Sequence, residues 1–281
     1  MASKIELHRV VIFIKGNRMS DKTSKRDELT DAELMRYSRQ IMLPKFDIAG
    51  QLALVNAKVL IVGLGGLGSP VALYLASAGV GHLFLADYDC VDTSNLQRQI
   101  IHRENNVNRL KVESAAETLH QLNSLIKTTL YSKRFSLDEL DVAINKVDVV
   151  VDCSDNFETR IAINKSCVRN KTPLVSGAAI RMEGQVSVFD FRQAESPCYQ
   201  CLFPEMPNES RDQEDGLSCS ESGVMAPLVG IIGSMQAMET LKLLSGLGET
   251  LSGRLLLLDA MSMQWRSLKL NKDVHCACCS I

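Results

Sequence analysis

The sequence predicts an α/β fold in which helices cover both faces of a mostly parallel sheet. Lys58–Val62 (KVLIV) is typical of a buried strand, and the glycine-rich segment 63–68 (GLGGLG) and an apolar helical stretch over 69–78 follow it. Strand, G-x-G-x-x-G and helix together begin a βαβ unit. Strands and helices then alternate as far as residue 177, as a parallel sheet requires. The fold is therefore predicted to be Rossmann-like.

The N-terminal part precedes this unit. Residues 1–28 are mostly polar after a short apolar run, so we expect a disordered extension, or a chain that naturally starts at Met19 instead of Met1. Residues 29–281 are predicted to form a single domain. Thr30 and Glu33 form a capping-box pattern that predicts a helix through Met42. A second helix is expected over 48–56.

The remaining elements follow in order. Periodicity and turn residues predict strands at 82–86, 128–131, 147–152 and 173–177, and helices at 109–122 and 158–169. After Gly184 the pattern alternates between polar and apolar residues, which predicts that 185–191 is an antiparallel edge strand. The acidic, proline-containing segment 204–216 predicts a long mobile loop. A helix at 230–244 and strands at 254–259 and 264–270 complete the fold.

Composition excludes several classes of protein. The chain has 281 residues, 46% of them hydrophobic, and a net charge of −2. Length and apolar content allow an ample core. The near-neutral charge argues against a nucleic-acid partner, and no apolar run is long enough to span a membrane. We therefore expect a cytoplasmic protein, in which nine cysteines indicate metal binding or reactive thiols instead of disulfides.

Two cysteine pairs predict a metal site. Cys198 and Cys201 form one C-x-x-C pair, and Cys276 and Cys279 form another. Two such pairs supply the four thiolates of a tetrahedral zinc site, which would be structural because no ligand position stays open. The alternative is unrelated buried cysteines. Replacement of one ligand by Cys278 or His275 is a further alternative.

The glycine-rich segment predicts a nucleotide site. Bare backbone and a helix N-terminus in this arrangement bind phosphate groups. Asp87 ends the next predicted strand, where an acidic residue holds a ribose hydroxyl. These features alone also fit an NAD-dependent dehydrogenase.

Charged residues after the second and fourth strands favour a triphosphate over a dinucleotide. Arg98 and Lys111 are predicted at the carboxyl edge of the sheet, near the amide of Asn95, unless they are ordinary solvated surface charges. Asp155 ends a buried strand and either binds Mg²⁺ beside the phosphates or caps the following helix.

The motifs occur together in one order. G-x-G-G-x-G, D-x-D, S-N-L-Q-R-Q, K-V-E-S-A, D-C-x-D-N, S-G-A-A-I-R-M-E-G-Q, C-x-x-C, E-S-G-V-M-A-P and a terminal C-x-x-C are all present. From about residue 29 to 279 the chain resembles the bacterial adenylyltransferases related to ubiquitin-activating enzymes. Within this family it is most similar to the molybdopterin-synthase branch, and next to the thiamine sulfur-carrier branch.

The resemblance implies an ATP-dependent reaction on a small ubiquitin-like sulfur-carrier protein that ends in Gly-Gly. The carrier's terminal carboxylate would attack the α-phosphate of ATP, and a sulfur donor would then convert the adenylate into a thiocarboxylate. No sulfurtransferase motif follows the second cysteine pair, so a separate protein would deliver the sulfur. The molybdopterin and thiamine pathways both remain open, as does a non-catalytic nucleotide-binding scaffold.

The resemblance also implies roles for individual residues. Gly66 and Asp87 would hold the nucleoside, Asn95, Arg98 and Lys111 the phosphates, and Asp155 the Mg²⁺. The implied ATP-binding residues are Gly66, Asp87, Ser94, Asn95, Leu96, Gln97, Arg98, Lys111, Asp155 and Asn156, with Arg39 from the partner subunit of a homodimer.

Cys219 lies at the position of a cysteine that forms a covalent link in some family members and is dispensable in others. Both roles remain open for Cys219, and a lone loop cysteine is otherwise inert.

Overall fold

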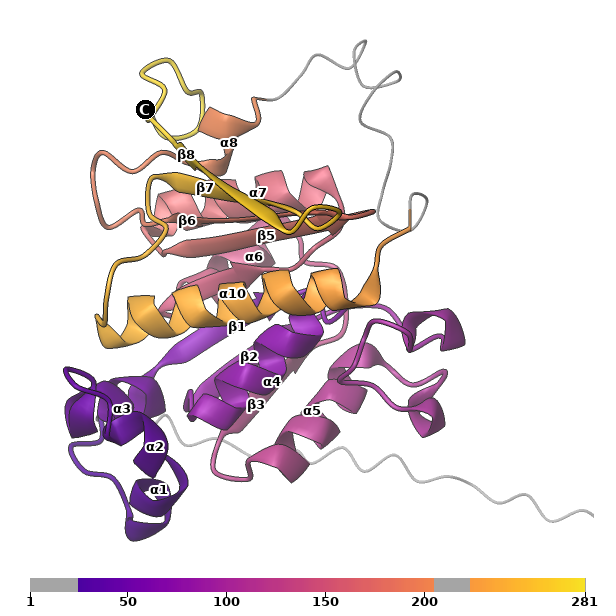
Figure 1. Ribbon diagram of the computed structural model, residues 1–281, viewed down its shortest axis with the longest axis vertical. Helices are drawn as coiled ribbons and strands as arrows, with labels where there is room; N and C mark the ends of the chain where they lie inside the picture. The colour runs from indigo at the N-terminus through magenta and orange to yellow at the C-terminus, as the bar shows by residue number, and fades with distance from the viewer. Residues whose placement is uncertain (1–24, 205–222, 281) are drawn as a thin grey trace, which may run out of the picture.

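The computed structural model describes residues 25–204 and 223–280, and its described residues contain one eight-stranded sheet of order β3-β2-β1-β4-β5-β6-β7-β8 (Figure 1). The strands are β1 Lys58–Val62, β2 His82–Ala86, β3 Lys127–Tyr131, β4 Val149–Asp152, β5 Leu174–Ile180, β6 Glu183–Phe189, β7 Arg254–Asp259 and β8 Gln264–Lys269. The five neighbouring strands β3, β2, β1, β4 and β5 form a parallel segment of the sheet, and β6, β7 and β8 extend it by antiparallel pairing. The predicted fold class is confirmed.

Helices lie on both faces of the sheet (Figure 1). One face packs against α4 Gly68–Ala78, α5 Lys111–Leu122 and α10 Ala226–Ser245, and the other against α6 Leu137–Ile144 and α7 Phe157–Asn170. The N-terminal helices are α1 Asp31–Arg36, α2 Ser38–Ile41 and α3 Asp47–Asn56, and the short elements are η1 Thr93–Asn95, η2 Glu104–Asn106 and α8 Tyr199–Leu202. None of the helices in the described part of the chain is long and apolar enough to cross a bilayer.

The strands β2, β1, β4 and β5 each supply two cores, because successive side chains of a strand point to opposite faces. Val59 and Ile61 of β1 belong to the core that includes α4, α5 and α10, whereas Leu60 and Val62 belong to the core that includes α6 and α7. All four side chains are buried. Burial on both faces explains why β1 is an uninterrupted apolar run after its first residue.

Strand order reverses at β1, because β2 pairs with one of its sides and β4 with the other. The loops after β1 and β4 therefore diverge and leave a crevice at the carboxyl ends of the strands. Such a reversal is where ligands bind in open α/β sheets.

The structure corrects some element boundaries. The helix predicted from Thr30 to Met42 has the expected capping box but divides at Tyr37, whose buried side chain accepts a hydrogen bond from Asn123 at 2.9 Å. The helices α6 and α8 were missed by the sequence prediction. The predicted strand 185–191 is antiparallel but is not an edge, since β6 pairs with both β5 and β7.

Some predictions fall on residues 1–24, 205–222 or 281, which lie outside the described residues. They are the N-terminal extension up to residue 24, all but the first residue of the loop 204–216, and Cys219. Within the described part, the Arg26 guanidinium donates to the Glu33 carboxylate at 2.7 Å. The division at residue 28 remains a prediction.

Candidate functional site

A cavity of about 460 Å³ lies at the carboxyl ends of β1, β2 and β4, where the strand order reverses. Six of the predicted ligand-binding residues line it: Gly66, Asp87, Arg98, Lys111, Asp155 and Asn156. They come from the glycine loop, from the segments that follow β2 and β4, and from the first turn of α5. The volume is within the range of roughly 300–1,000 Å³ found for small-molecule sites.

Five other predicted residues are not among those that line the cavity: Arg39, Ser94, Asn95, Leu96 and Gln97. Asn95 instead ends η1, where its side-chain oxygen accepts from the Asp92 amide at 3.3 Å. Arg39 is exposed on α2, away from the cavity of its own chain. These five residues were expected to bind ATP together with the other six, but they do not form part of the cavity wall.

The glycine loop is tightly packed. A Cβ atom on Gly68 would lie 1.9 Å from the Gly63 carbonyl oxygen, so only glycine allows the loop to turn into α4. A Cβ atom on Gly66 would lie 3.0 Å from the Val229 side chain of α10. This close packing fixes the loop backbone at the edge of the cavity, where Gly65, Gly66 and Leu67 form part of the wall.

Asp87 connects the glycine loop to the end of β2. One carboxylate oxygen accepts from the Leu64 amide at 2.7 Å and the other from the Asp89 amide at 2.9 Å. Burial raises the pKa of Asp87, while the Lys111 ammonium, 4.0 Å away, opposes that change. Each oxygen retains a second lone pair that can accept from a ribose hydroxyl.

The two predicted cations are held in different ways. Lys111 is buried, and its Nζ donates to Asp89 Oδ2 at 2.8 Å. Arg98 is half-buried and donates to the Ser94 carbonyl at 3.0 Å. An ammonium has three N–H donors and a guanidinium five, so both groups have further donors for an anion.

Two further cations of the wall, Lys133 and Arg134, were missed by the sequence analysis. The Arg134 guanidinium lies 4.5 Å from the centroid of the Tyr88 ring and donates to its hydroxyl at 2.8 Å. These cations follow β3 in a loop without any motif. The available signal was the capping box of Ser136 and Glu139, which begins α6 directly after them.

The loop after β4 separates the two possible roles of Asp155. The N-cap of α7 is Asn156, whose side chain accepts from the Thr159 amide at 2.9 Å. The alternative in which Asp155 caps this helix is therefore wrong. Asp155 is exposed and lines the cavity, so its carboxylate is available to a cation bound there.

A buried ion pair between Asp152 and Arg160 stabilises this loop. Asp152 accepts from the Ser154 hydroxyl at 2.6 Å and pairs with Arg160 at 3.4 Å. The Arg160 guanidinium also donates to the Ser154 carbonyl. Charge-assisted bonds of this kind, shielded from water, give the backbone just before Asp155 a defined position.

The donor set fits a nucleoside triphosphate. Arg98 and Lys111 supply positive charge, and the glycine loop supplies backbone close to a helix N-terminus. In addition, Gln99 is buried in the wall, and its Oε1 has no hydrogen-bond partner among the described residues. Buried side-chain acceptors normally accept a hydrogen bond, so this atom indicates that a bound ligand supplies the missing donor.

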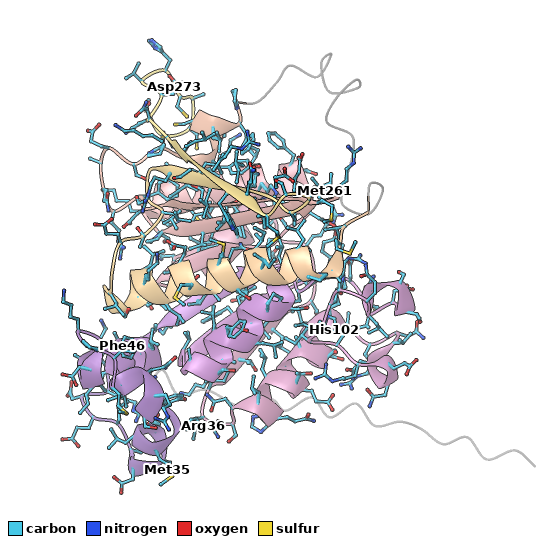
Figure 2. All side chains as sticks on the ribbon, in the orientation of Figure 1. Met35, Arg36, Phe46, His102, Met261 and Asp273 are labelled. Atoms are coloured by element: carbon cyan, nitrogen blue, oxygen red, sulfur yellow. The ribbon has the colours of Figure 1, made fainter. Side chains whose placement is uncertain are left out.

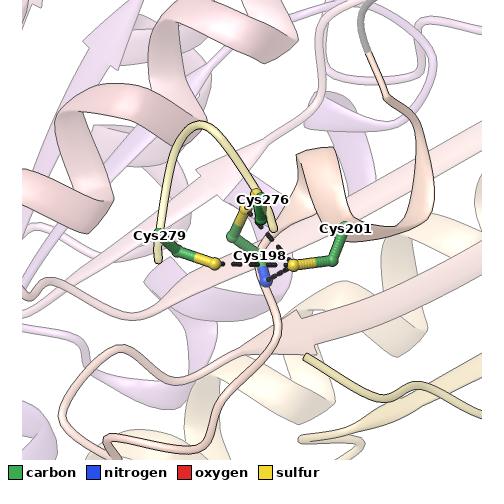
Figure 3. Close-up of side chains that lie close together, drawn as sticks. All are labelled: Cys198, Cys201, Cys276 and Cys279. Carbon is green, nitrogen blue, oxygen red and sulfur yellow. Dashed lines mark hydrogen bonds between the residues drawn. The ribbon is translucent and has the colours of Figure 1, made fainter. Parts of the chain in front are cut away.

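A second site lies where the C-terminal tail meets α8, and its four cysteines are not among the residues that line the cavity (Figure 3). The Sγ atoms of Cys198, Cys201, Cys276 and Cys279 all lie within 4.8 Å of one another. Three of the Sγ–Sγ separations are 3.4, 3.6 and 3.9 Å. A tetrahedron with Zn–S bonds of about 2.3 Å has edges of about 3.8 Å, so the spacing fits zinc.

A cation between the four thiols would also relieve the repulsion that arises when they ionise. A hydrogen bond with Cys278 lowers the pKa of Cys198 to about 4, whereas burial raises the pKa of Cys201 and Cys279. Four thiolates so close together repel one another unless a metal ion neutralises them. The cluster is compatible with zinc, and the alternative of unrelated buried cysteines is excluded by their proximity.

Known proteins of one family are similar to this chain over most of its length. A family model described as the ThiF family matches residues 37–279. The molybdopterin-synthase adenylyltransferase of Escherichia coli K12 is 49% identical over 90% of this chain and 98% of its own length. The enzyme of the same name from Salmonella typhimurium LT2 is 48% identical with the same coverage. The adenylyltransferase and sulfurtransferase MOCS3 of Culex quinquefasciatus is 44% identical over 90% of this chain, which covers 57% of that protein.

Solved structures agree on the fold. E. coli MccB in complex with MccA-N7isoASN superposes with a TM-score of 0.77 at 22% identity, over 91% of this chain and 76% of that one. Selenomethionine-labelled PaaA superposes with a TM-score of 0.73 at 22% identity, over 91% of this chain and 79% of that one.

Proposed function

Since the chain belongs to the ThiF family, we propose that it is an ATP-dependent adenylyltransferase that activates the C-terminal carboxylate of a small sulfur-carrier protein. One observation carries the proposal from this chain's own residues. Gly66, Asp87, Arg98, Lys111 and Asp155 line one cavity at the point where the strand order of the sheet reverses.

The reaction needs alignment and charge neutralisation more than covalent help from the protein. An oxygen of the carrier carboxylate attacks the α-phosphorus, the bond from that phosphorus to the β-phosphate oxygen breaks, and pyrophosphate leaves with the electron pair. We assign Asp87 to the ribose, and Arg98 and Lys111 to the phosphate oxygens, where negative charge shifts during the step. These residues approach the cavity from separate elements, so they can contact different parts of one nucleotide.

We assign Asp155 to Mg²⁺. Carboxylate oxygens are preferred ligands of this ion, and Asp155 is exposed at the cavity and does not cap α7. When bound, Mg²⁺ would neutralise phosphate charge. Asn156 keeps the loop in place by capping α7.

We further propose a structural zinc ion held by Cys198, Cys201, Cys276 and Cys279. It would join the C-terminal tail to α8 and to the core beside Tyr199. Reduced cysteines gathered as metal ligands are typical of a reducing compartment, which supports a cytoplasmic location.

The proposed partners are a carrier ending in Gly-Gly, a sulfur donor outside this chain, and a second copy of the chain. The names of the two bacterial relatives favour the small subunit of molybdopterin synthase as carrier, with the thiamine-pathway carrier as the alternative. The exposed position of Arg39, outside its own cavity, supports a role in the partner's site. We keep Ser94, Asn95, Leu96 and Gln97 as candidates that would reach ATP only after a local rearrangement.

Pyrophosphate exchange tests the proposal. The chain is mixed with ATP, Mg²⁺ and labelled pyrophosphate, and each candidate carrier is added separately. We expect label in ATP only with a carrier that has an intact Gly-Gly terminus, and none with the same carrier lacking both glycines. Absence of exchange with every carrier, despite tight ATP binding, would favour a nucleotide-binding scaffold. Tighter binding of NAD than of ATP would favour a dehydrogenase.

A further inference from the structure

His102 is a buried histidine for which the proposed reaction has no use. It belongs to the segment that connects β2 to α5, and its side chain is only 4% exposed (Figure 2). Its Nε2 lies 3.0 Å from the Leu64 carbonyl oxygen, and its Nδ1 lies 2.8 Å from the Ser114 hydroxyl. Because a carbonyl can only accept, Nε2 carries the proton, and Nδ1 of the neutral ring accepts from Ser114.

Leu64 is the second residue of the glycine loop, and both polar groups of its backbone are held. Its N–H donates to Asp87 at 2.7 Å, and its carbonyl accepts from His102. The next three residues of the loop line the cavity. The Gly63–Leu64 peptide is thus held by the Asp87 carboxylate, and the Leu64–Gly65 peptide by the His102 imidazole.

The same ring reaches α5, which carries one of the proposed phosphate ligands. Ser114 lies three residues after Lys111, so both occupy one face of the helix. Lys111 and Ser114 are buried, as is His102. The ring therefore joins two segments that line the cavity: the glycine loop and the first turn of α5.

We propose that His102 is a positioning residue for nucleotide binding, which holds the Leu64 carbonyl and so fixes the glycine loop at the wall of the cavity. This inference rests on the proposed function for the identity of the nucleotide. It does not depend on the carrier, because ATP binding alone reports on the loop.

Two substitutions separate the bonds of the ring. The side-chain amide of His102→Gln can take the place of Nε2 and still donate to Leu64. The shorter side chain of His102→Asn can take the place of Nδ1 near Ser114 but leaves the Leu64 carbonyl without its donor. Ser114→Ala removes the other bond and leaves the contact with Leu64, so it is the matched control.

ATP affinity is measured by calorimetry with Mg²⁺, at a temperature at which circular dichroism shows each variant folded. We expect about tenfold weaker binding for His102→Asn, and changes below about threefold for His102→Gln and Ser114→Ala. In pyrophosphate exchange, the KM for ATP should rise in His102→Asn more than kcat falls. Equal ATP affinity in all three variants and the wild type would overturn the proposal, because His102 would then have only a structural role.

A measurement on the unaltered protein covers the case in which His102→Asn does not fold. Nitrogen NMR of the histidine rings at neutral pH should show His102 uncharged with its proton on Nε2. A neutral ring with its proton on Nδ1 would contradict the bond to Leu64, and a charged ring would contradict acceptance of the Ser114 proton at Nδ1. If no carrier supports exchange while His102→Asn still loses ATP affinity, the proposed function fails and the role of His102 stands.

Discussion

Asp155 and Asn156 are adjacent residues for which the structure predicts opposite phenotypes. Asp155→Asn removes the charge proposed to bind Mg²⁺ but leaves the helix cap intact, so exchange activity should fall by about a hundredfold with an unchanged melting temperature. Asn156→Ala removes the acceptor for the Thr159 amide and should cost about 1 kcal/mol of stability. Exchange assays and thermal melts of both variants check this. Near-normal exchange by Asp155→Asn would refute its assignment to Mg²⁺.

His102 also predicts how stability depends on pH. Burial lowers the pKa of His102 from its ordinary 6.5 to about 4. Lys111 and Arg103 contribute in the same direction, while the bond to Leu64 opposes it. Between these two pKa values the unfolded chain binds a proton that the folded chain does not. Stability should therefore fall as pH drops from 6.5 to 4, by on the order of 2 kcal/mol in all.

Other groups titrate nearby, so the measurement is a comparison. The Arg26 hydrogen bond lowers the pKa of Glu33 to about 2, so its contribution is lost only below pH 4.5. The raised pKa of Asp87 acts in the opposite sense to His102. Urea unfolding of the wild type and of His102→Gln from pH 7 to 4.5 isolates the histidine. Parallel curves for the two proteins would show that His102 titrates normally.

Among the elements, α8 and the C-terminal tail depend on the proposed zinc ion. Metal analysis should find about one zinc per chain, and Cys201→Ser should lose it and about 2 kcal/mol or more of stability. Cys278→Ser is the matched control, because Cys278 lies beside the cluster but is not one of its four thiols. Retention of zinc by Cys201→Ser, or its loss from Cys278→Ser, would show that the ligand set is wrong.

The accuracy of the sequence predictions differs between elements for physical reasons. β1, β2 and β7 were predicted with their observed bounds, because each is a strand of five or six residues that contains a continuous apolar run and is bounded by turn residues. The helices α6 and α8 are short, with 8 and 4 residues, and a window of that length carries little periodic signal. Each was overlooked although it coincides with a recognisable feature: α6 begins at a capping box, and α8 directly follows Cys198 and contains Cys201.

For the site, sequence motifs predicted residue types better than contacts. The glycine loop, Asp87 and Asp155 could be placed because they closely follow strands whose ends share one edge of the sheet, and Lys111 because it lies in the segment that leaves β2. The bond from His102 to Leu64 spans 38 residues and has no motif. It depends on how two loops pack against each other, and a single sequence does not specify this.

For the whole molecule, the position of Arg39 makes the proposed dimer testable. Arg98 lines the cavity of its own chain, whereas Arg39 is exposed on α2 and is proposed to enter the partner's cavity. If so, Arg39→Ala and Arg98→Ala damage the same site from different subunits. In a heterodimer of the two variants, one site then carries both substitutions and the other carries neither.

Subunit mixing therefore distinguishes a contact between subunits from one within a subunit. Each variant alone should lose about one to three kcal/mol of charge-assisted bonding to phosphate and exchange slowly. After random re-association half of the dimers are mixed, and each has one intact site, so about a quarter of wild-type activity should return. Native mass spectrometry confirms that subunits exchange. A mixture of exchanged subunits that stays as inactive as its components would mean that Arg39 does not act across the interface.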